Sequence, residues 1–270
     1  MPSRYESLVN DLDTQSFHKM PLRCSRADIE TAVKAFFTFM ELPEATKRRF
    51  AFKLEDYQGQ MEMGYWTRSR AEGKADNREY FHYDAAADEA FRKTGTDCPE
   101  LMTFLDAAKI VYEATLPTLR EAVQIIDEVY PGIEKKIFEP GPGRFLQAPI
   151  RFLGYPNTDP GDFLASGHYD KGIVTLAIAE SAPGLRIGKT PDTVQDVIHE
   201  EGYGLFFPAI QLEPLTNPHF APSWHDVIQK DQDTFTSDYS RWAVVLFFAA
   251  WDERATTWED RHKPKQKTME

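Results

Sequence analysis

The second half of the chain consists of short apolar runs that are separated at close intervals by turn-forming residues. Runs such as GIVTLAIAE, YGLFFPAIQL and RWAVVLFF are each long enough for one strand, and Gly, Pro, Asn and Asp stand between them. Such spacing favours an antiparallel sandwich or barrel over βαβ units, which would place helices between the strands. We therefore expect an all-β core over residues 144–270.

The first half shows mainly helical spacing. One segment opens at Ser25, a residue suited to cap a helix, and continues with apolar residues three and four positions apart. A second segment runs from Cys98 to Val129, where Pro117 should kink or divide the helix. Between them, QGQMEMGYWTRSRAEGKADNREYFHYD contains many turn formers and predicts a loop-rich stretch. We expect a mainly helical part, residues 1–143, packed on the β core as one compact α+β unit.

Composition excludes several kinds of partner. The 270 residues carry 43 acidic and 31 basic side chains, for a net charge of −12, whereas nucleic acids and anionic membranes select basic surfaces. Cys24 and Cys98 match neither a disulfide framework nor a cysteine-rich zinc site. The first residues lack the apolar core of a signal peptide, and no run approaches the roughly 20 apolar residues of a membrane helix. We expect a soluble, cytoplasmic protein with a small-molecule partner, and make no prediction of its oligomeric state.

Two histidines and an aspartate suggest a metal site in the β half. His168 and Asp170 stand two residues apart ahead of a strand-like run, so a strand there would aim both side chains at one point. The H-x-D pattern alone is common by chance, and taken by itself it more often marks an ordinary surface pair. His225, in PSWHDV, supplies a second imidazole. Two histidines and one carboxylate form the facial triad of non-haem Fe(II) oxygenases, which leaves room for a cosubstrate and O₂.

Arg241 adds an anion-binding candidate. It enters the apolar run WAVVLFF, where burial would be costly without an anionic partner, and its planar guanidinium suits a carboxylate. Taken alone it could form a salt bridge at the rim of the protein. Of the other histidines, His82 is expected to pack in a loop and His199 to lie in a solvent-facing turn.

With these residues in place, the sequence resembles the isopenicillin-N-synthase-like group of Fe(II)/2-oxoglutarate-dependent dioxygenases. The likeness covers most of the chain. It includes the segments IETAVKAFFTFMELPEATKRRF, MGYWTRS with DNREYFHYD, APIRFLGYPN, GHYDKGIVTLAIAESAPGLRI and YGLFFPAIQLEPLTNPHFAPSWHDV. The resemblance implies a double-stranded β-helix, or jelly roll, for the C-terminal half.

The resemblance also implies roles for individual residues. His168, Asp170 and His225 would bind Fe(II), while Arg241 and Tyr155 would hold 2-oxoglutarate. One departure concerns the family's R-x-S motif, which here reads Arg-Trp-Ala, so one hydroxyl contact to the cosubstrate is missing. This weakens the cosubstrate assignment more than the iron assignment. An iron-dependent oxidase that does not use 2-oxoglutarate therefore remains an alternative.

The implied reaction is hydroxylation or desaturation of a small molecule, with O₂ as oxidant. Related halogenases have a small residue where this chain has Asp170, so halogenation is disfavoured. Several arginines near the expected pocket favour a carboxylate-bearing substrate, such as an amino acid or a natural-product intermediate. Candidate substrate contacts are Arg78, Arg151, Trp242 and Trp251. Two further alternatives are a catalytically inactive small-molecule-binding homologue and a cupin-like metal enzyme, although the H-x-H pattern of cupins is absent.

Overall fold

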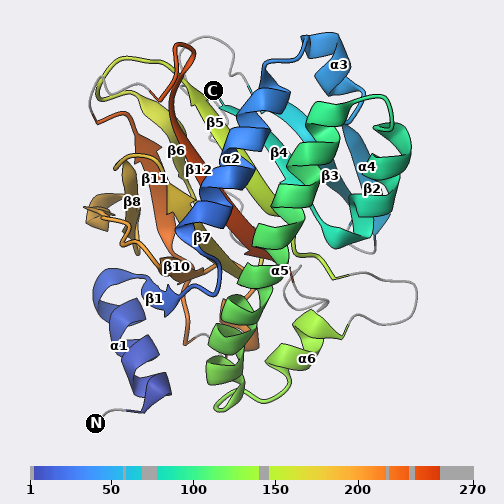
Figure 1. Ribbon diagram of the computed structural model, residues 1–270. Coiled ribbons are helices and arrows are strands. Elements are labelled where there is room, and N and C mark those ends of the chain that lie inside the picture. Colours follow the sequence, from blue (N-terminus) through green and yellow to red (C-terminus); the bar gives the residue numbers. More distant parts are fainter. Residues whose placement is uncertain are drawn as a thin grey trace, which may run out of the picture.

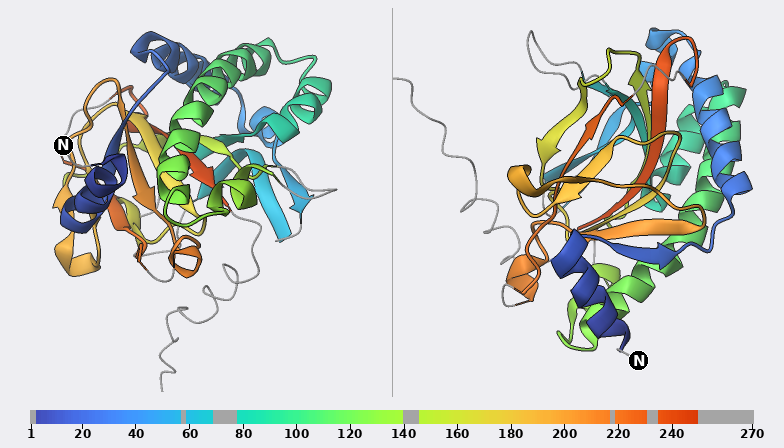
Figure 2. Two further views of the ribbon diagram at one scale, coloured as in Figure 1. Left: turned by 90° about the horizontal axis from the view of Figure 1, so that it is seen from below. Right: turned by 90° about the vertical axis from the view of Figure 1, so that its left-hand side faces the viewer.

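Two antiparallel sheets face each other, and helices cover the outer face of the larger sheet (Figures 1 and 2). The structure is a computed structural model that describes residues 3–56, 59–68, 78–139, 146–216, 219–230 and 235–249. The architecture is that of an α+β protein with a β-sandwich core, as the spacing of the apolar runs predicts. None of the described helices is long and apolar enough to cross a membrane.

The larger sheet has eight strands in the order β1-β10-β7-β12-β5-β4-β3-β2, and the smaller has four in the order β6-β11-β8-β9. The strands of the larger sheet are β1 (His18–Pro21), β2 (Phe52–Asp56), β3 (Gly59–Arg68), β4 (Arg78–Tyr83), β5 (Ile150–Pro156), β7 (Val174–Glu180), β10 (Tyr203–Pro208) and β12 (Tyr239–Phe248). Those of the smaller sheet are β6 (Phe163–His168), β8 (Leu185–Gly188), β9 (Gln195–Asp196) and β11 (Trp224–Ile228).

The α-helices are α1 (Arg4–Gln15), α2 (Arg26–Met40), α3 (Glu44–Arg48), α4 (Asp88–Thr94), α5 (Pro99–Asp127) and α6 (Ile133–Phe138). Three short 3₁₀ turns are η1 (Ala85–Ala87), η2 (Pro191–Thr193) and η3 (Glu213–Leu215). Helix α2 begins where the sequence predicts, because the Ser25 hydroxyl accepts the Asp28 N–H at 3.1 Å. Helix α5 is not divided at Pro117, since its apolar face is buried along almost its whole length and outweighs the lost backbone hydrogen bond.

Two apolar layers hold the sandwich together. In the outer layer α2 and α5 pack on the larger sheet, with Phe104 of α5 lying 5.6 Å from Phe36 and 5.1 Å from Phe152 between ring centroids. In the inner layer Leu153, Phe207 and other side chains of both sheets pack against each other. Strand β7 is covered on both faces, which is why its sequence, VTLAIAE, is apolar apart from Thr175 and its last residue, Glu180.

The N-terminal part is not simply helical, because it supplies four strands of the larger sheet. Strand β1 pairs with β10 and β4 pairs with β5, so the two parts share one hydrogen-bonded sheet. The prediction of a loop-rich stretch was wrong for β3 and β4. Its turn formers are concentrated in residues 69–77, which lie outside the described residues, while Met61, Met63 and Tyr65 alternate along β3 as a strand requires.

Candidate metal centre and its two cavities

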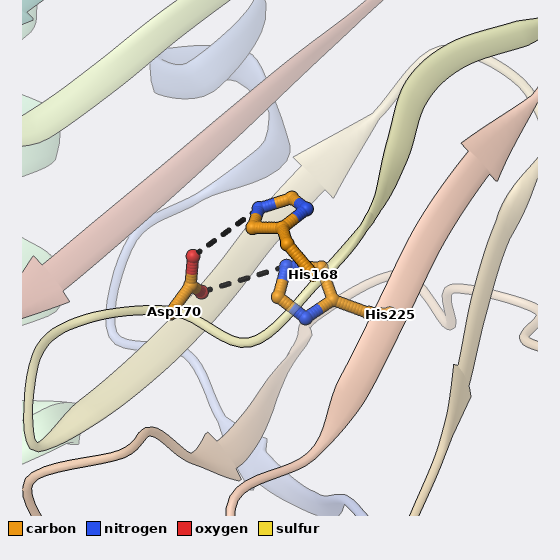
Figure 3. Close-up of side chains that lie close together, drawn as sticks. All are labelled: His168, Asp170 and His225. Atoms are coloured by element: carbon orange, nitrogen blue, oxygen red, sulfur yellow. Dashed lines mark ion pairs between the residues drawn. The ribbon is translucent and has the colours of Figure 1, made fainter. Parts of the chain in front are cut away.

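Two neighbouring strands of the smaller sheet bring the two predicted histidines together. His168 ends β6, His225 lies near the start of β11, and the two residues are direct partners in this antiparallel pair. Their ring centroids are 4.4 Å apart. Figure 3 shows both imidazoles and the carboxylate of Asp170 converging, with dashed lines from Asp170 to each ring.

Asp170 lies just beyond the end of β6 rather than on the strand, so contacts outside β6 set its position. Its backbone carbonyl accepts the N–H of Ile210 at 3.0 Å. Its carboxylate Oδ2 accepts the hydroxyl of the buried Thr175, on β7, at 2.6 Å. As a result, Oδ1 lies 3.6 Å from Nε2 of His168 and Oδ2 lies 3.6 Å from Nε2 of His225.

Backbone carbonyls orient both imidazoles. Nδ1–H of His168 donates to the carbonyl of Ser166 at 2.7 Å, and Nδ1–H of His225 donates to that of Ser223 at 3.3 Å. Each Nε2 is then left as the ligand atom, an arrangement typical of metal-binding histidines. The three ligand atoms lie within 4.8 Å of one another, and no second group of this kind occurs among the described residues. Two imidazoles and a carboxylate on this spacing fit a divalent transition metal.

The ionisation states suit metal ligation. Burial alone would raise the pKa of Asp170, but His225, His168 and the Thr175 hydroxyl together hold that pKa well below its usual range. Burial lowers the pKa of His225, which favours the neutral imidazole. A metal ion requires this combination of an ionised carboxylate and a neutral imidazole.

The three residues stand between two cavities. The inner cavity, of about 60 Å³, lies between the sheets and reaches from the three residues to Arg241. The outer cavity, of about 420 Å³, is lined on its other sides by Arg68, His82 and Lys171. His168, Asp170, Arg78 and Arg151 line both cavities.

Arg241, the residue that the sequence suggested for anion binding, lies at the inner end of the inner cavity. Its side chain is 2% exposed, and its guanidinium carbon lies 5.4 Å from the centre of the Tyr155 ring. Nη2 donates to the carboxylate of Glu180, whereas Nε and Nη1 are buried without a hydrogen-bond partner among the described residues. Gly184, with φ of +149°, leaves room for this group, because a Cβ there would lie 2.6 Å from Nη1 of Arg241.

Arg151 is a half-buried cation that lines both cavities. Its guanidinium lies 4.9 Å from the ring centre of Tyr80 and 4.6 Å from that of Phe247. Its Nε–H donates to Nε2 of His82 at 2.5 Å, and Nδ1–H of His82 donates to the carbonyl of Glu62 at 2.8 Å. No carboxylate among the described residues forms an ion pair with Arg151. Burial, together with the nearby Arg78, lowers the pKa of Arg151 to about 10.

One of the expected substrate contacts, Trp242, does not line the site. Trp242 follows Arg241 on β12 and therefore faces the opposite side, where it packs in the outer layer beneath the guanidinium of Arg26 at 5.2 Å. It is not a residue of either cavity, so we do not include it in the substrate site. Trp251 lies outside the described residues. By contrast, His199 is half-buried and lines the inner cavity, so the expectation that it lies in a solvent-facing turn was wrong.

Glu180 and Thr175 are site residues that the sequence interpretation missed. Both lie on β7, a run that reads simply as a buried strand, and each hydrogen-bonds to a predicted site residue. An acid at the end of an otherwise apolar strand was the available signal for Glu180. Nothing in the sequence marked Thr175, because Thr is a common strand residue.

No protein-family model matches the sequence, and no curated protein matches it. Solved structures do match. The dioxygenase for auxin oxidation 1 from Arabidopsis thaliana, solved with 2-oxoglutarate, has a TM-score of 0.68 at 14% identity over 91% of this chain and 87% of that one. A full-length protein from Neurospora crassa, solved in complex with alpha-KG, has a TM-score of 0.65 at 18% identity, over 91% of this chain and 79% of that one. A protein assigned to the 2OG-Fe(II) oxygenase family, from Caulobacter crescentus, has a TM-score of 0.66 at 20% identity, over 92% of this chain and 82% of that one.

These structural neighbours are 2OG-Fe(II) oxygenases, and the chain has their fold. The jelly-roll core that the sequence resemblance implies is therefore confirmed. The His-Asp-His group lies within that fold, between its two sheets.

Proposed function

We propose that the protein is a non-haem Fe(II)- and 2-oxoglutarate-dependent dioxygenase that hydroxylates or desaturates a small, carboxylate-bearing molecule. The observation that carries this proposal is the position of His168, Asp170 and His225 between two cavities, one ending at a buried arginine and the other bordered by cations. The likeness to structures solved with 2-oxoglutarate supports the same function.

In this proposal the three residues hold Fe(II) through Nε2 of each histidine and an oxygen of Asp170. Three protein ligands leave the remaining coordination positions for a chelating cosubstrate and for O₂. Bound iron would supply the activation of O₂, while the protein supplies orientation and shields the site from water. The backbone carbonyls of Ser166 and Ser223 keep the imidazoles in the required tautomer.

Arg241 and Tyr155 would receive the distal carboxylate of 2-oxoglutarate. Two buried donors of Arg241, Nε and Nη1, lack partners among the described residues, and an anion in the inner cavity would satisfy them. The ring of Tyr155 lies against the guanidinium and shapes this end of the cavity. Buried polar groups are costly without such a partner, so the fit rests on the unsatisfied donors themselves.

The outer cavity is suited to an anionic substrate. Arg68, Arg78, Arg151 and Lys171 line it although the chain as a whole has a net charge of −12. Arg151 is held by two aromatic rings and a neutral histidine, so binding a carboxylate there would cost little side-chain entropy. We therefore propose Arg151 and Arg78 as the groups that orient the substrate carboxylate.

A second candidate function is supported by the ion pair between Arg241 and Glu180. An arginine that is already neutralised by a buried glutamate is less attractive to another carboxylate. This observation favours an oxidase of the same fold that uses iron and O₂ without 2-oxoglutarate.

The test is an anaerobic titration of the metal-free protein with Fe(II), followed by 2-oxoglutarate. The proposed function expects iron to bind and a weak iron-to-keto-acid charge-transfer band to appear in the visible difference spectrum. The band should be lost in His225→Ala and kept in His219→Ala, whose exposed ring bonds to the Tyr130 hydroxyl. Succinate release in air, screened against small carboxylic acids, would then identify the substrate. Iron binding without the band would favour the oxidase, and no iron binding would refute both.

A further inference from the structure

Glu180 occupies an unusual place for an acid. It is the last residue of β7 and lines the inner cavity, where the anion site lies. Its side chain is 7% exposed, and its carboxylate accepts Nη2–H of Arg241, whose side chain is 2% exposed. The pair is therefore shielded from solvent, and an anion that enters this cavity meets a cation that has a partner already.

The sheet register explains why the two side chains meet. Glu180 is the cross-strand partner of Ala243, which lies two residues after Arg241 on the same face of β12. A serine at position 243 would place a hydroxyl beside the guanidinium. In this chain the methyl group of Ala243 offers no hydrogen bond, and the Glu180 carboxylate supplies the contact to Arg241.

We propose that Glu180 is a specificity-determining residue that weakens the hold of Arg241 on the distal carboxylate of 2-oxoglutarate, so that keto acids without this carboxylate bind about as well. This inference rests on the proposed function. A distal carboxylate has to share Arg241 with Glu180 or displace Glu180 from it. Both arrangements reduce the favourable free energy of binding, whereas an uncharged end group does not compete with Glu180.

A second cavity next to Glu180 offers space for its carboxylate when 2-oxoglutarate displaces it. Together with Arg26, His199 and Glu201, Glu180 lines this small cavity of about 40 Å³. Burial raises the pKa of Glu180, and Arg241 opposes that shift. The arrangement thus allows 2-oxoglutarate to bind, but less tightly than an unpaired arginine would.

The experiment measures the dissociation constants of 2-oxoglutarate and 2-oxopentanoate for the Fe(II)-loaded protein, anaerobically, from the charge-transfer band. In 2-oxopentanoate a methyl group replaces the distal carboxylate. The wild type should favour 2-oxoglutarate by less than about tenfold, whereas Glu180→Gln should bind 2-oxoglutarate about tenfold tighter or more and leave 2-oxopentanoate unchanged. The gain follows because a glutamine amide donates to a carboxylate instead of repelling it.

Glu79→Gln is the matched control. Glu79 is a half-buried glutamate that pairs with Lys47 at 3.4 Å and lines neither the inner nor the outer cavity, so its loss should change neither constant. The wild-type preference needs no variant and tests the proposal even if Glu180→Gln fails to fold. A wild-type preference for 2-oxoglutarate of about tenfold or more, or the same affinity for 2-oxoglutarate in wild type and Glu180→Gln, would overturn the inference and leave the proposed function intact. No band with either keto acid in any protein would overturn both.

Discussion

His168 and His225 are direct cross-strand partners, and each Nε2 lies 3.6 Å from a different oxygen of Asp170, that of His168 from Oδ1 and that of His225 from Oδ2. Hydrogen bonds between β6 and β11 therefore fix the spacing of the imidazoles before any metal arrives. Sites built on strands in this way are more rigid than sites built on loops. Asp170 is the one ligand that lies on a loop, and Thr175 holds its carboxylate.

Because the ligands are formed in the folded chain, Fe(II) should stabilise the native state. At a free concentration about 100 times its dissociation constant, a ligand that binds only the native state adds about 2.7 kcal/mol to the free energy of unfolding. We expect the wild type to show a higher Tm with Fe(II) under anaerobic conditions, and His168→Ala to show no such increase. An equal increase in His168→Ala would mean that iron binds elsewhere.

Thr175→Val should weaken Fe(II) binding without changing the fold. The substitution keeps the shape of the side chain but removes the hydroxyl that donates to Asp170 at 2.6 Å. Loss of such an outer contact typically costs about 10- to 100-fold in metal affinity. Competition with a chelator would measure it. Thr115→Val is the control, since that buried hydroxyl bonds only to backbone carbonyls within α5; the idea fails if both variants lose affinity equally.

Arg151→Met should make the protein more stable and weaken the binding of a carboxylate at the proposed substrate site. Arg151 is half-buried beside aromatic rings without a carboxylate partner among the described residues, so an apolar side chain of similar length avoids the cost of partly desolvating a charge. We expect the free energy of unfolding in urea to rise by about 1 kcal/mol. Arg186→Met should destabilise the protein instead, because Arg186 donates two hydrogen bonds to the buried Asp226. A loss of stability in Arg151→Met would show that the cation itself supports the fold.

His82 should make stability depend on pH in a defined direction. Burial, and then the positive charge of Arg151, lower the pKa of His82 well below its usual value, and Nε2 must stay unprotonated to accept from Arg151. Below about pH 6.5 the unfolded chain therefore binds a proton that the folded chain does not, so stability falls as the pH falls.

The measurement compares the wild type with His82→Gln, whose amide oxygen can accept from Arg151. From about pH 7 to about pH 5 the free energy of unfolding of the wild type should drop by about 2 kcal/mol more than that of the variant. Other titrating groups are common to both proteins and cancel in this difference. If the difference in the free energy of unfolding between the two proteins stays constant with pH, His82 does not contribute to the pH dependence of stability.

The sequence pointed to the three residues that the structure brings together as candidate metal ligands, and it missed the acid beside the arginine, for a physical reason. His168, Asp170 and His225 are chemically distinctive and stand at strand ends, so their types and order are informative. The contact between Glu180 and Arg241 depends on the register of β7 against β12, which apolar patterns do not specify when both strands are buried. Strand alternation alone, however, would have shown that Arg241 and Trp242 cannot both line one pocket.

The two missed strands have a similar explanation. Strands β3 and β4 extend the larger sheet beyond β5, and the segment that joins them in the chain is rich in turn formers. Those residues dominated the interpretation, while the alternation of Met61, Met63 and Tyr65 was the weaker signal. The helices were easier, because their apolar faces repeat over several turns.

The order of strands in the larger sheet has a consequence for biosynthesis. Strand β12 is the last described strand in the chain, yet it lies between β7 and β5 in the middle of the sheet. A nascent chain that has not yet released residues 239–248 from the ribosome therefore exposes two unpaired strand edges at the centre of its future core. The larger sheet cannot be completed until β12 has been released, and a chain that is terminated before β12 should be a substrate for chaperones and proteases rather than a smaller active protein.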